Sequence, residues 1–146
     1  MTNIALHCQL IIFTYENKSI FLTLVLVVTS FALSAQSIEG TWKLVEESNP
    51  LPEGFTNLKH ITSTHFMWTI IDKDGNIATG AGGTYTLKDG VYIETVLFTL
   101  PGMQNLKGKK AIYKLNMDDK TMSLSGYIEF DENTRSPNSE KRERIE

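Results

Sequence analysis

Several groups of residues have types and spacings that could support chemistry. Asp72, Asp74 and Asn76, with Gly75 between the last two, resemble the start of a calcium-binding loop. Such a loop needs a bidentate Glu at its twelfth position and flanking helices, but the twelfth residue from Asp72 is Gly83. Asp, Gly and Asn are also ordinary turn residues. We therefore expect a hairpin turn here and no metal site.

Histidines and carboxylates offer a second set of candidates. His60 and His65 are five residues apart and could face each other on adjacent strands, but two histidines without a third ligand make a weak zinc site. Glu94 and Glu129 could form the carboxylate pair that a glycosidase needs. Glu94 lies in an apolar strand, so if it points inward it needs a partner such as Lys or Tyr, because a bare buried charge is costly.

Motifs for nucleophilic or phosphate chemistry are incomplete. There is no Gly-x-Ser-x-Gly motif for a hydrolase. Gly80, Gly82 and Gly83 lack the Gly-Lys-Ser/Thr ending and following helix of a phosphate loop, and a strand bulge or barrel bend is the expected structure. We predict no catalytic residues, no metal and no cofactor.

Aromatic and methionine side chains suggest a different role, the binding of a small apolar ligand. Tyrosine hydroxyls among them would supply the few polar anchors that are typical of a small-molecule site. The alternative is that these side chains fill a solid core, as protein interiors usually do. The candidate ligand-binding residues are Phe66, Trp68, Tyr85, Tyr92, Tyr113 and Met122.

The elements that must position these residues are short strands separated by turns. The Asp89-Gly90 step joins two β-rich runs and predicts a hairpin. Residues 91–98 are apolar on both faces, which predicts a central strand covered on each side, and the polar residues 131–140 predict a loop. The pattern indicates an all-β, antiparallel sandwich or barrel. Its strands are expected at residues 41–46, 59–63, 66–71, 83–87, 91–98, 110–117, 121–130 and 142–146.

The N-terminal third is typical of a targeting segment. Residues 20–33 are uncharged, Lys18 precedes them, and Ser34 and Ala35 follow, which is the order of a secretory signal peptide. We predict residues 1–35 as an extension plus cleaved signal, residues 36–146 as the domain, and a secreted or periplasmic location. An uncleaved membrane anchor is the alternative, but the run is short for a membrane-spanning helix. No stable membrane insertion is expected after cleavage. Cys8 lies in the removed part, which leaves the domain without a cysteine.

Short motifs resemble a known group of barrels. Gly40-x-Trp42 at the first strand, the hairpin around Gly90, and Arg144 near the chain end are similar to the lipocalin-like (calycin) domains, and most of all to the small bacterial secreted DUF4488 group. The resemblance implies an up-and-down meander barrel of about eight strands with an internal cavity. It also implies that Trp42 closes one end, with Arg144, or as second choice Arg142, packed across the indole.

Charge and resemblance together favour a binding protein. A balance of 14 Lys+Arg against 17 Asp+Glu argues against nucleic acid as a partner. The first hypothesis is a secreted barrel that holds a small apolar ligand. The alternative is a filled barrel that acts as a cell-envelope interaction or scaffold domain through the loops at 50–52 and 100–109. An enzyme using Glu94 or a histidine has the least support, and the sequence does not set the oligomeric state.

Overall fold

The computed structural model describes residues 37–48 and 50–146. The expected signal segment 20–33, Cys8 and the cleavage point near Ala35 lie outside these residues. In the part that is described, no helix is long and apolar enough to cross a membrane.

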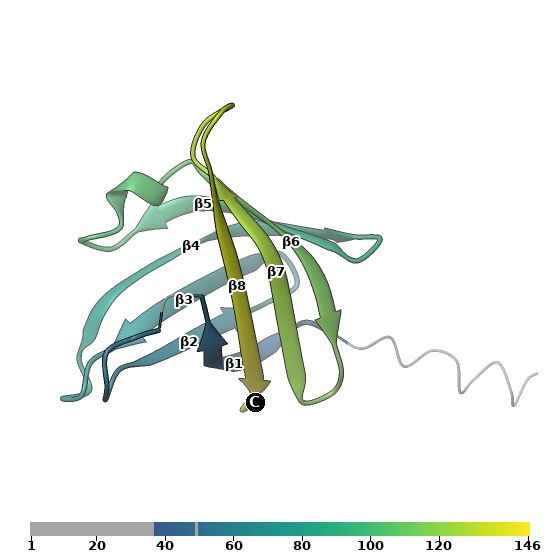
Figure 1. Cartoon of the computed structure of the whole chain (residues 1–146). Coiled ribbons are helices and arrows are strands. Elements are labelled where there is room, and N and C mark those ends of the chain that lie inside the picture. The colour runs from purple at the N-terminus through teal and green to yellow at the C-terminus, as the bar shows by residue number, and fades with distance from the viewer. Residues whose placement is uncertain (1–36, 49) are drawn as a thin grey trace, which may run out of the picture. The chain divides into compact units, whose positions relative to one another are not determined.

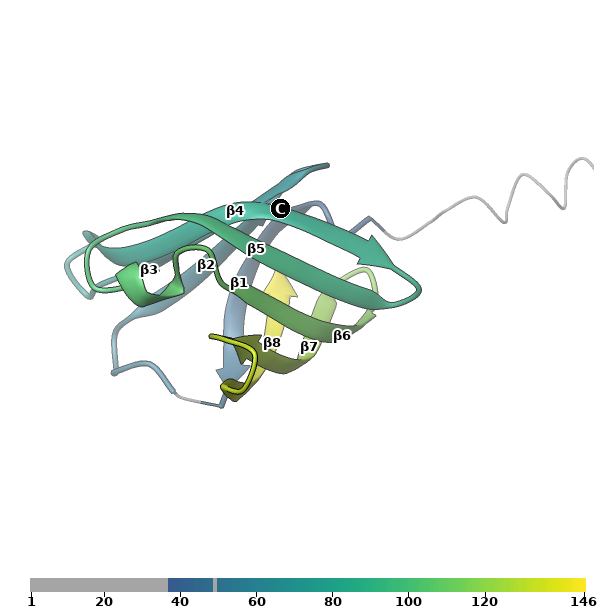
Figure 2. The same cartoon turned by 90° about the horizontal axis from the view of Figure 1, so that it is seen from above.

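Eight antiparallel strands form a closed barrel in simple up-and-down order (Figure 1). Each strand pairs with the next along the chain, and β8 returns to pair with β1, as the view in Figure 2 also shows. The predicted all-β, up-and-down barrel is confirmed. The elements are β1 (Gly40–Glu47), β2 (Thr56–Ile61), β3 (His65–Ile71), β4 (Ile77–Lys88), β5 (Val91–Thr99), the short 3₁₀ helix η1 (Gln104–Leu106), β6 (Lys110–Met117), β7 (Thr121–Glu129) and β8 (Arg135–Arg144).

The turns form where acidic side chains and glycines meet. The Asp72 carboxylate accepts hydrogen bonds from the backbone N–H groups of Asp74 and Asn76, each at 2.9 Å, and so shapes the β3–β4 turn. Asp89 and Gly90 adopt the left-handed backbone conformation, with φ of 52° and 75°, that a tight β4–β5 hairpin requires. Both predicted turns are confirmed.

Glycines bend the long strand β4. The pairing of β4 with β5 shifts register between Gly82 and Gly83, which marks a bulge. A Cβ on Gly83 would overlap the carbonyl oxygen of Thr95, so the two backbones approach closely there only because the side chain is missing. The predicted bulge is confirmed.

Four predictions about the strands are wrong. The outer face of β5 is not covered, since Val91, Leu97 and Phe98 are 42%, 52% and 47% exposed. A barrel has one interior, so only one face of each strand can be buried. Residues 135–140 are not a loop but the first part of β8, and β2 begins three residues before its predicted start at Lys59. β4 begins at Ile77 rather than at the predicted Gly83, because glycines that suggested a break lie inside the strand.

Apolar side chains fill one end of the barrel, which we call the closed end. The buried residues Trp42, Phe66, Tyr92 and Met122 meet there, and the indole Nε1 of Trp42 donates a hydrogen bond of 2.9 Å to the Ile38 carbonyl. The segment just before β1 is thereby fastened to the core.

Arg144 covers the indole from outside. Its guanidinium carbon lies 4.1 Å from the centroid of the Trp42 ring. The same group donates to the carbonyl oxygens of Ser37, Glu39 and Asp119, at 2.6, 2.6 and 3.0 Å. Arg144 therefore ties the N-terminal segment, the β6–β7 turn and β8 together over Trp42. The second choice for this contact, Arg142, points into the barrel instead.

Candidate functional site

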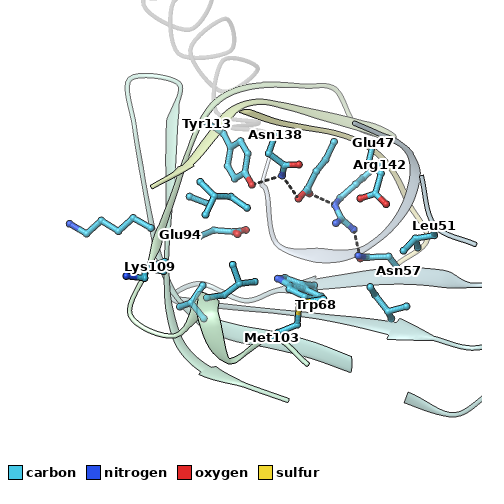
Figure 3. Close-up of a pocket in the computed structure, with 17 residues that line it drawn as sticks. Glu47, Leu51, Asn57, Trp68, Glu94, Met103, Lys109, Tyr113, Asn138 and Arg142 are labelled. Atoms are coloured by element: carbon cyan, nitrogen blue, oxygen red, sulfur yellow. Dashed lines mark hydrogen bonds and ion pairs between the residues drawn. The ribbon is translucent and has the colours of Figure 1, made fainter. Parts of the chain in front are cut away.

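The other end of the barrel, the open end, contains a cavity of about 290 Å³ (Figure 3). Apolar side chains from β3, β5 and the loop around η1 form what we call the apolar wall. In Figure 3, Trp68 and Met103 of this wall lie across the cavity from Asn138 and Arg142. The apolar wall consists of Leu51, Trp68, Ile70, Val96, Met103 and Leu106, and what we call the polar wall consists of Asn57, Glu94, Tyr113, Asn138, Glu140 and Arg142.

The cavity exists because two pairs of strands separate towards this end. β1 pairs with β2 only over residues 40–43, while residues 44–47 pair with β8 alone. A second hollow of about 330 Å³ lies in the gap between β1 and β2, and it shares Glu47, Leu51 and Asn57 with the cavity. The gap thus joins the cavity to the outside.

The loop between β5 and β6 covers the cavity on another side. β5 and β6 pair only up to Thr95 and Lys110. Two backbone hydrogen bonds, from Val96 N–H to the Lys109 carbonyl at 3.0 Å and from Gly108 N–H to the Val96 carbonyl at 2.9 Å, then close the intervening loop. This places Met103 and Leu106 over the cavity.

Four buried charges form a chain through the polar wall. The Lys59 ammonium lies 2.9 Å from Oε1 of Glu94 and 3.0 Å from Oε2 of Glu140. The same Glu140 oxygen accepts a hydrogen bond of 2.7 Å from Nε of Arg142. The Lys59 and Arg142 side chains are 0% and 1% exposed, so this network is screened from bulk water. The partner that Glu94 was expected to need, if it pointed inward, is Lys59.

Two asparagines, Asn57 and Asn138, join this charge network through further hydrogen bonds. Nη1 of Arg142 donates to Oδ1 of Asn57 at 3.0 Å, which links β8 to β2 across the barrel. Nδ2 of Asn138 donates to the Tyr113 hydroxyl at 2.8 Å and makes a longer contact of 3.4 Å with Oε1 of Glu140. Both oxygens of Glu140 are therefore engaged.

The network sets the protonation of its carboxyls. Burial opposes ionisation of Glu140, but the charges of Lys59 and Arg142 outweigh it and lower the pKa of this carboxyl from 4.5 to about 2. Glu47, at the mouth of the cavity, has a raised pKa because it is partly buried and faces the Glu140 charge. Burial, reinforced by Glu140 and Glu94, raises the pKa of the Tyr113 hydroxyl, which stays neutral. Glu140 thus stays ionised between the two cations that contact it.

Some polar atoms of the polar wall remain unused. Nη2 of Arg142 makes no hydrogen bond with a described residue, and besides Lys59 the Glu94 carboxylate has only the buried Tyr92 hydroxyl beside it. Because a carboxylate can accept several hydrogen bonds, one acceptor position on Glu94 and one donor on Arg142 are left for a molecule in the cavity.

The structure separates the six candidate ligand-binding residues into two groups. Trp68 and Tyr113 line the cavity. The others do not line it: Phe66, Tyr92 and Met122 belong to the closed-end core, and Tyr85 packs on Tyr92 with 5.2 Å between ring centroids. A role in ligand binding stays a prediction for Trp68 and Tyr113.

The other candidates lie apart from the cavity. His60 is hydrogen-bonded to the Thr41 hydroxyl at 3.1 Å and His65 to the Thr64 hydroxyl at 2.7 Å. No cluster of three or more metal-ligating side chains occurs among the residues that the structure describes. Glu129 pairs with Arg135 at 3.0 Å near the surface, whereas Glu94 is buried among the four charges, so the two carboxylates do not form a pair.

Sequence reasoning missed most of the polar wall. Asn57 and Lys59 alternate on β2, and Asn138, Glu140 and Arg142 alternate on β8, so each set faces inward with period two. A search for alternating residues that treats long polar side chains as candidates for the interior would have found both sets.

Comparisons with known proteins give one finding. Residues 37–146 match the family model described as Domain of unknown function (DUF4488). No curated protein and no solved structure matched significantly.

Proposed function

This chain belongs to the DUF4488 family, and we propose that its barrel is a carrier or receptor for a small molecule, bound in the open-end cavity. The observation that carries the proposal is the pairing of an apolar wall with a polar wall around about 290 Å³ of space. Small-molecule sites are mostly apolar, with a few well-placed polar groups.

The size of the cavity limits the ligand. A water molecule takes a share of about 30 Å³ in the liquid, so 290 Å³ corresponds to a ligand of roughly ten non-hydrogen atoms. A filled barrel that acts only as a scaffold does not need such a space, which favours binding over that alternative. The sequence predicted a small apolar ligand with a few polar anchors from tyrosine hydroxyls, and the polar wall now favours a molecule with one apolar and one polar side.

The buried charges support the same proposal. A buried ion network is weak evidence for stability, because the loss of hydration offsets most of the attraction between the charges. Glu94, Glu140 and Arg142 border a cavity rather than a packed core, and Lys59 pairs with both carboxylates behind them. Their position beside empty space fits recognition of a ligand better than it fits stabilisation of the barrel.

We also propose that the protein acts after export. The support is the uncharged segment 20–33 with Lys18 before it and Ala35 after it. Sequencing the N-terminus of protein recovered from outside the cytoplasm should give a start near Gln36 or Ser37. A product that retains residues 20–33 would instead indicate a membrane-anchored protein.

Native mass spectrometry combined with a blocked cavity tests the binding proposal. Ala111 is buried and lines the cavity, so Ala111→Phe should fill it. The same change at the exposed Ala78 is the matched control. We expect the wild type and Ala78→Phe to carry a co-purified small molecule, and Ala111→Phe to lose it.

A second variant guards against misfolding. Met103→Trp fills the cavity from the loop, where the backbone is less constrained than in β6. Loss of the bound molecule in both folded variants supports the proposal. Wild-type protein that carries nothing and shows no saturable change with any small amphiphile would refute it.

A further inference from the structure

We propose that the polar wall selects an uncharged headgroup that both donates and accepts a hydrogen bond, such as a primary amide or a hydroxyl, with a short hydrocarbon on Trp68. This inference rests on the proposed function and names the class of its ligand. It follows from how the charges of the polar wall are already matched.

The four buried charges cancel among themselves. Lys59 and Arg142 supply two positive charges, and Glu94 and Glu140 supply two negative ones. Each cation contacts at least one carboxylate within 3.0 Å. The polar wall therefore has no unmatched charge that would compensate an ionised ligand for losing its hydration.

An anionic headgroup fits this wall poorly. Lys109 and Lys110 also line the cavity, but the Lys109 ammonium donates to the Phe130 carbonyl at 2.6 Å and Lys110 is exposed. Arg142 is the buried cation of the lining, and its Nε already binds Glu140. A carboxylate beside Arg142 would also face the buried carboxylates of Glu94 and Glu140, which repel it. Glu47 at the mouth adds a further acidic group on the way in.

A cationic headgroup fits no better. Oε1 of Glu94 and both oxygens of Glu140 already accept hydrogen bonds from residues of the wall. An ammonium that reached Glu94 would lie close to Lys59 and Arg142. Glu47 is the remaining carboxylate, but it lies at the partly exposed mouth, where an ion pair is worth little.

A neutral headgroup matches the atoms that remain. The Glu94 carboxylate, beside the Tyr92 hydroxyl, has room to accept one further hydrogen bond, and Nη2 of Arg142 is a donor without an acceptor among the residues described. A primary amide offers an N–H to the first and a carbonyl oxygen to the second. Trp68, Val96 and Leu106 of the apolar wall then cover the hydrocarbon.

Four probes that differ only in the headgroup test this inference: octanamide, octan-1-ol, octanoate and octylamine. Each has nine or ten non-hydrogen atoms, which suits the cavity. At pH 7 we expect octanamide and octan-1-ol to bind at least tenfold more tightly than octanoate and octylamine. The change in Trp68 fluorescence emission measures the binding. Trp68→Phe, which leaves Trp42 in place, should remove most of the signal.

An isosteric change should reverse part of the selectivity. Glu94→Gln removes one negative charge and leaves Lys59 with an excess positive charge, so octanoate should bind at least fivefold more tightly than it binds to the wild type. Glu129→Gln removes a carboxylate near the surface, outside the cavity lining, and should change nothing. If Glu94→Gln does not fold, the wild-type ranking of the four probes decides the question.

The outcomes separate the two proposals. If octanoate or octylamine binds as tightly as octanamide, and Ala111→Phe abolishes that binding, the headgroup inference is wrong and the proposed function stands. If no probe binds, the headgroup inference is wrong, and the proposed function is wrong as well when the wild type also carries no co-purified molecule. If binding is unchanged in Ala111→Phe, both proposals are wrong.

Discussion

The two ends of the barrel are filled by different kinds of side chain. At the closed end, Trp42, Phe66 and Met122 are 0–2% exposed and pack into an apolar core. At the open end, Lys59 and Arg142 are equally buried, but they pair with carboxylates beside a cavity. Apolar burial stabilises a fold directly, whereas buried ion pairs barely repay their lost hydration. The closed end therefore supplies stability, and the open end can be specialised for recognition.

The largest loss of stability is expected at the closed end. Trp42→Ala removes a fully buried indole and should reduce the free energy of unfolding by about 4–5 kcal/mol, the upper range for large core truncations. Urea denaturation followed by circular dichroism measures it. Trp68→Phe, at a half-buried residue beside the cavity, should cost less than 1.5 kcal/mol as a swap between large side chains. Equal effects at the two tryptophans would remove the contrast between the ends.

Breaking the charge network should lower the free energy of unfolding slightly less than Trp42→Ala does. Lys59→Met leaves Glu94 and Glu140 without their shared cation and should destabilise the barrel by about 3–4 kcal/mol. Adding Glu94→Leu to that variant removes one uncompensated charge and should restore about half of the loss. A double variant less stable than Lys59→Met alone would show that the network stabilises the barrel as a unit, contrary to our comparison.

Acid should weaken the open end first. Glu140 has a folded pKa of about 2 against 4.5 in the unfolded chain, so its contribution is complete above about pH 4.5. The contribution of Glu140 is lost as the pH falls through 2, and it amounts to on the order of 3 kcal/mol of the free energy of unfolding. Glu47 has a raised pKa in the folded protein, so its protonation as the pH falls stabilises the fold and weakly offsets the loss at Glu140.

Denaturation between pH 6 and pH 2 measures this slope, and Glu140→Gln is the variant that should flatten it. If wild type and Glu140→Gln lose stability in parallel, the acid sensitivity comes from elsewhere.

A smaller effect is expected where Arg144 covers Trp42. Arg144→Ala loses the contact with the indole and three hydrogen bonds to carbonyl oxygens, at a cost of about 2 kcal/mol. Arg144→Lys should recover little, since an ammonium cannot stack as a plane or reach three carbonyls at once. Unfolding of Arg144→Ala at the wild-type midpoint would show that the arginine does not contribute to closing the barrel.

The same comparison explains what could be predicted from the sequence. Period-two alternation of apolar residues identified β6 and β7, where Tyr113, Met122 and Leu124 face the core. Turn residues such as Asp72 and Gly90 marked the hairpins. The predicted eight-stranded barrel followed from these signals and from the resemblance carried by Trp42.

Two of the misses, at β8 and β2, lie at the open end for a physical reason. β8 was predicted to begin at Arg142 because its earlier inward positions are Asn138 and Glu140, which carry no hydrophobic signal. The predicted β2 began too late, because the inward residue near its true start is Asn57, which is polar. Polar side chains can face the interior only when partners from other strands satisfy them, and those partners are not visible in a single strand. The pattern therefore missed the segments that build the candidate site.

An NMR titration tests the central claim, that the open end binds a small molecule and the closed end does not. Amide ¹H–¹⁵N spectra of the domain would be recorded with increasing octanamide. We predict saturable shifts at residues around the cavity, such as Glu94, Ala111 and Glu140, with one common affinity and with little change at Trp42 and Met122. Shifts centred on the closed end, or no saturable shifts at any residue, would contradict the account.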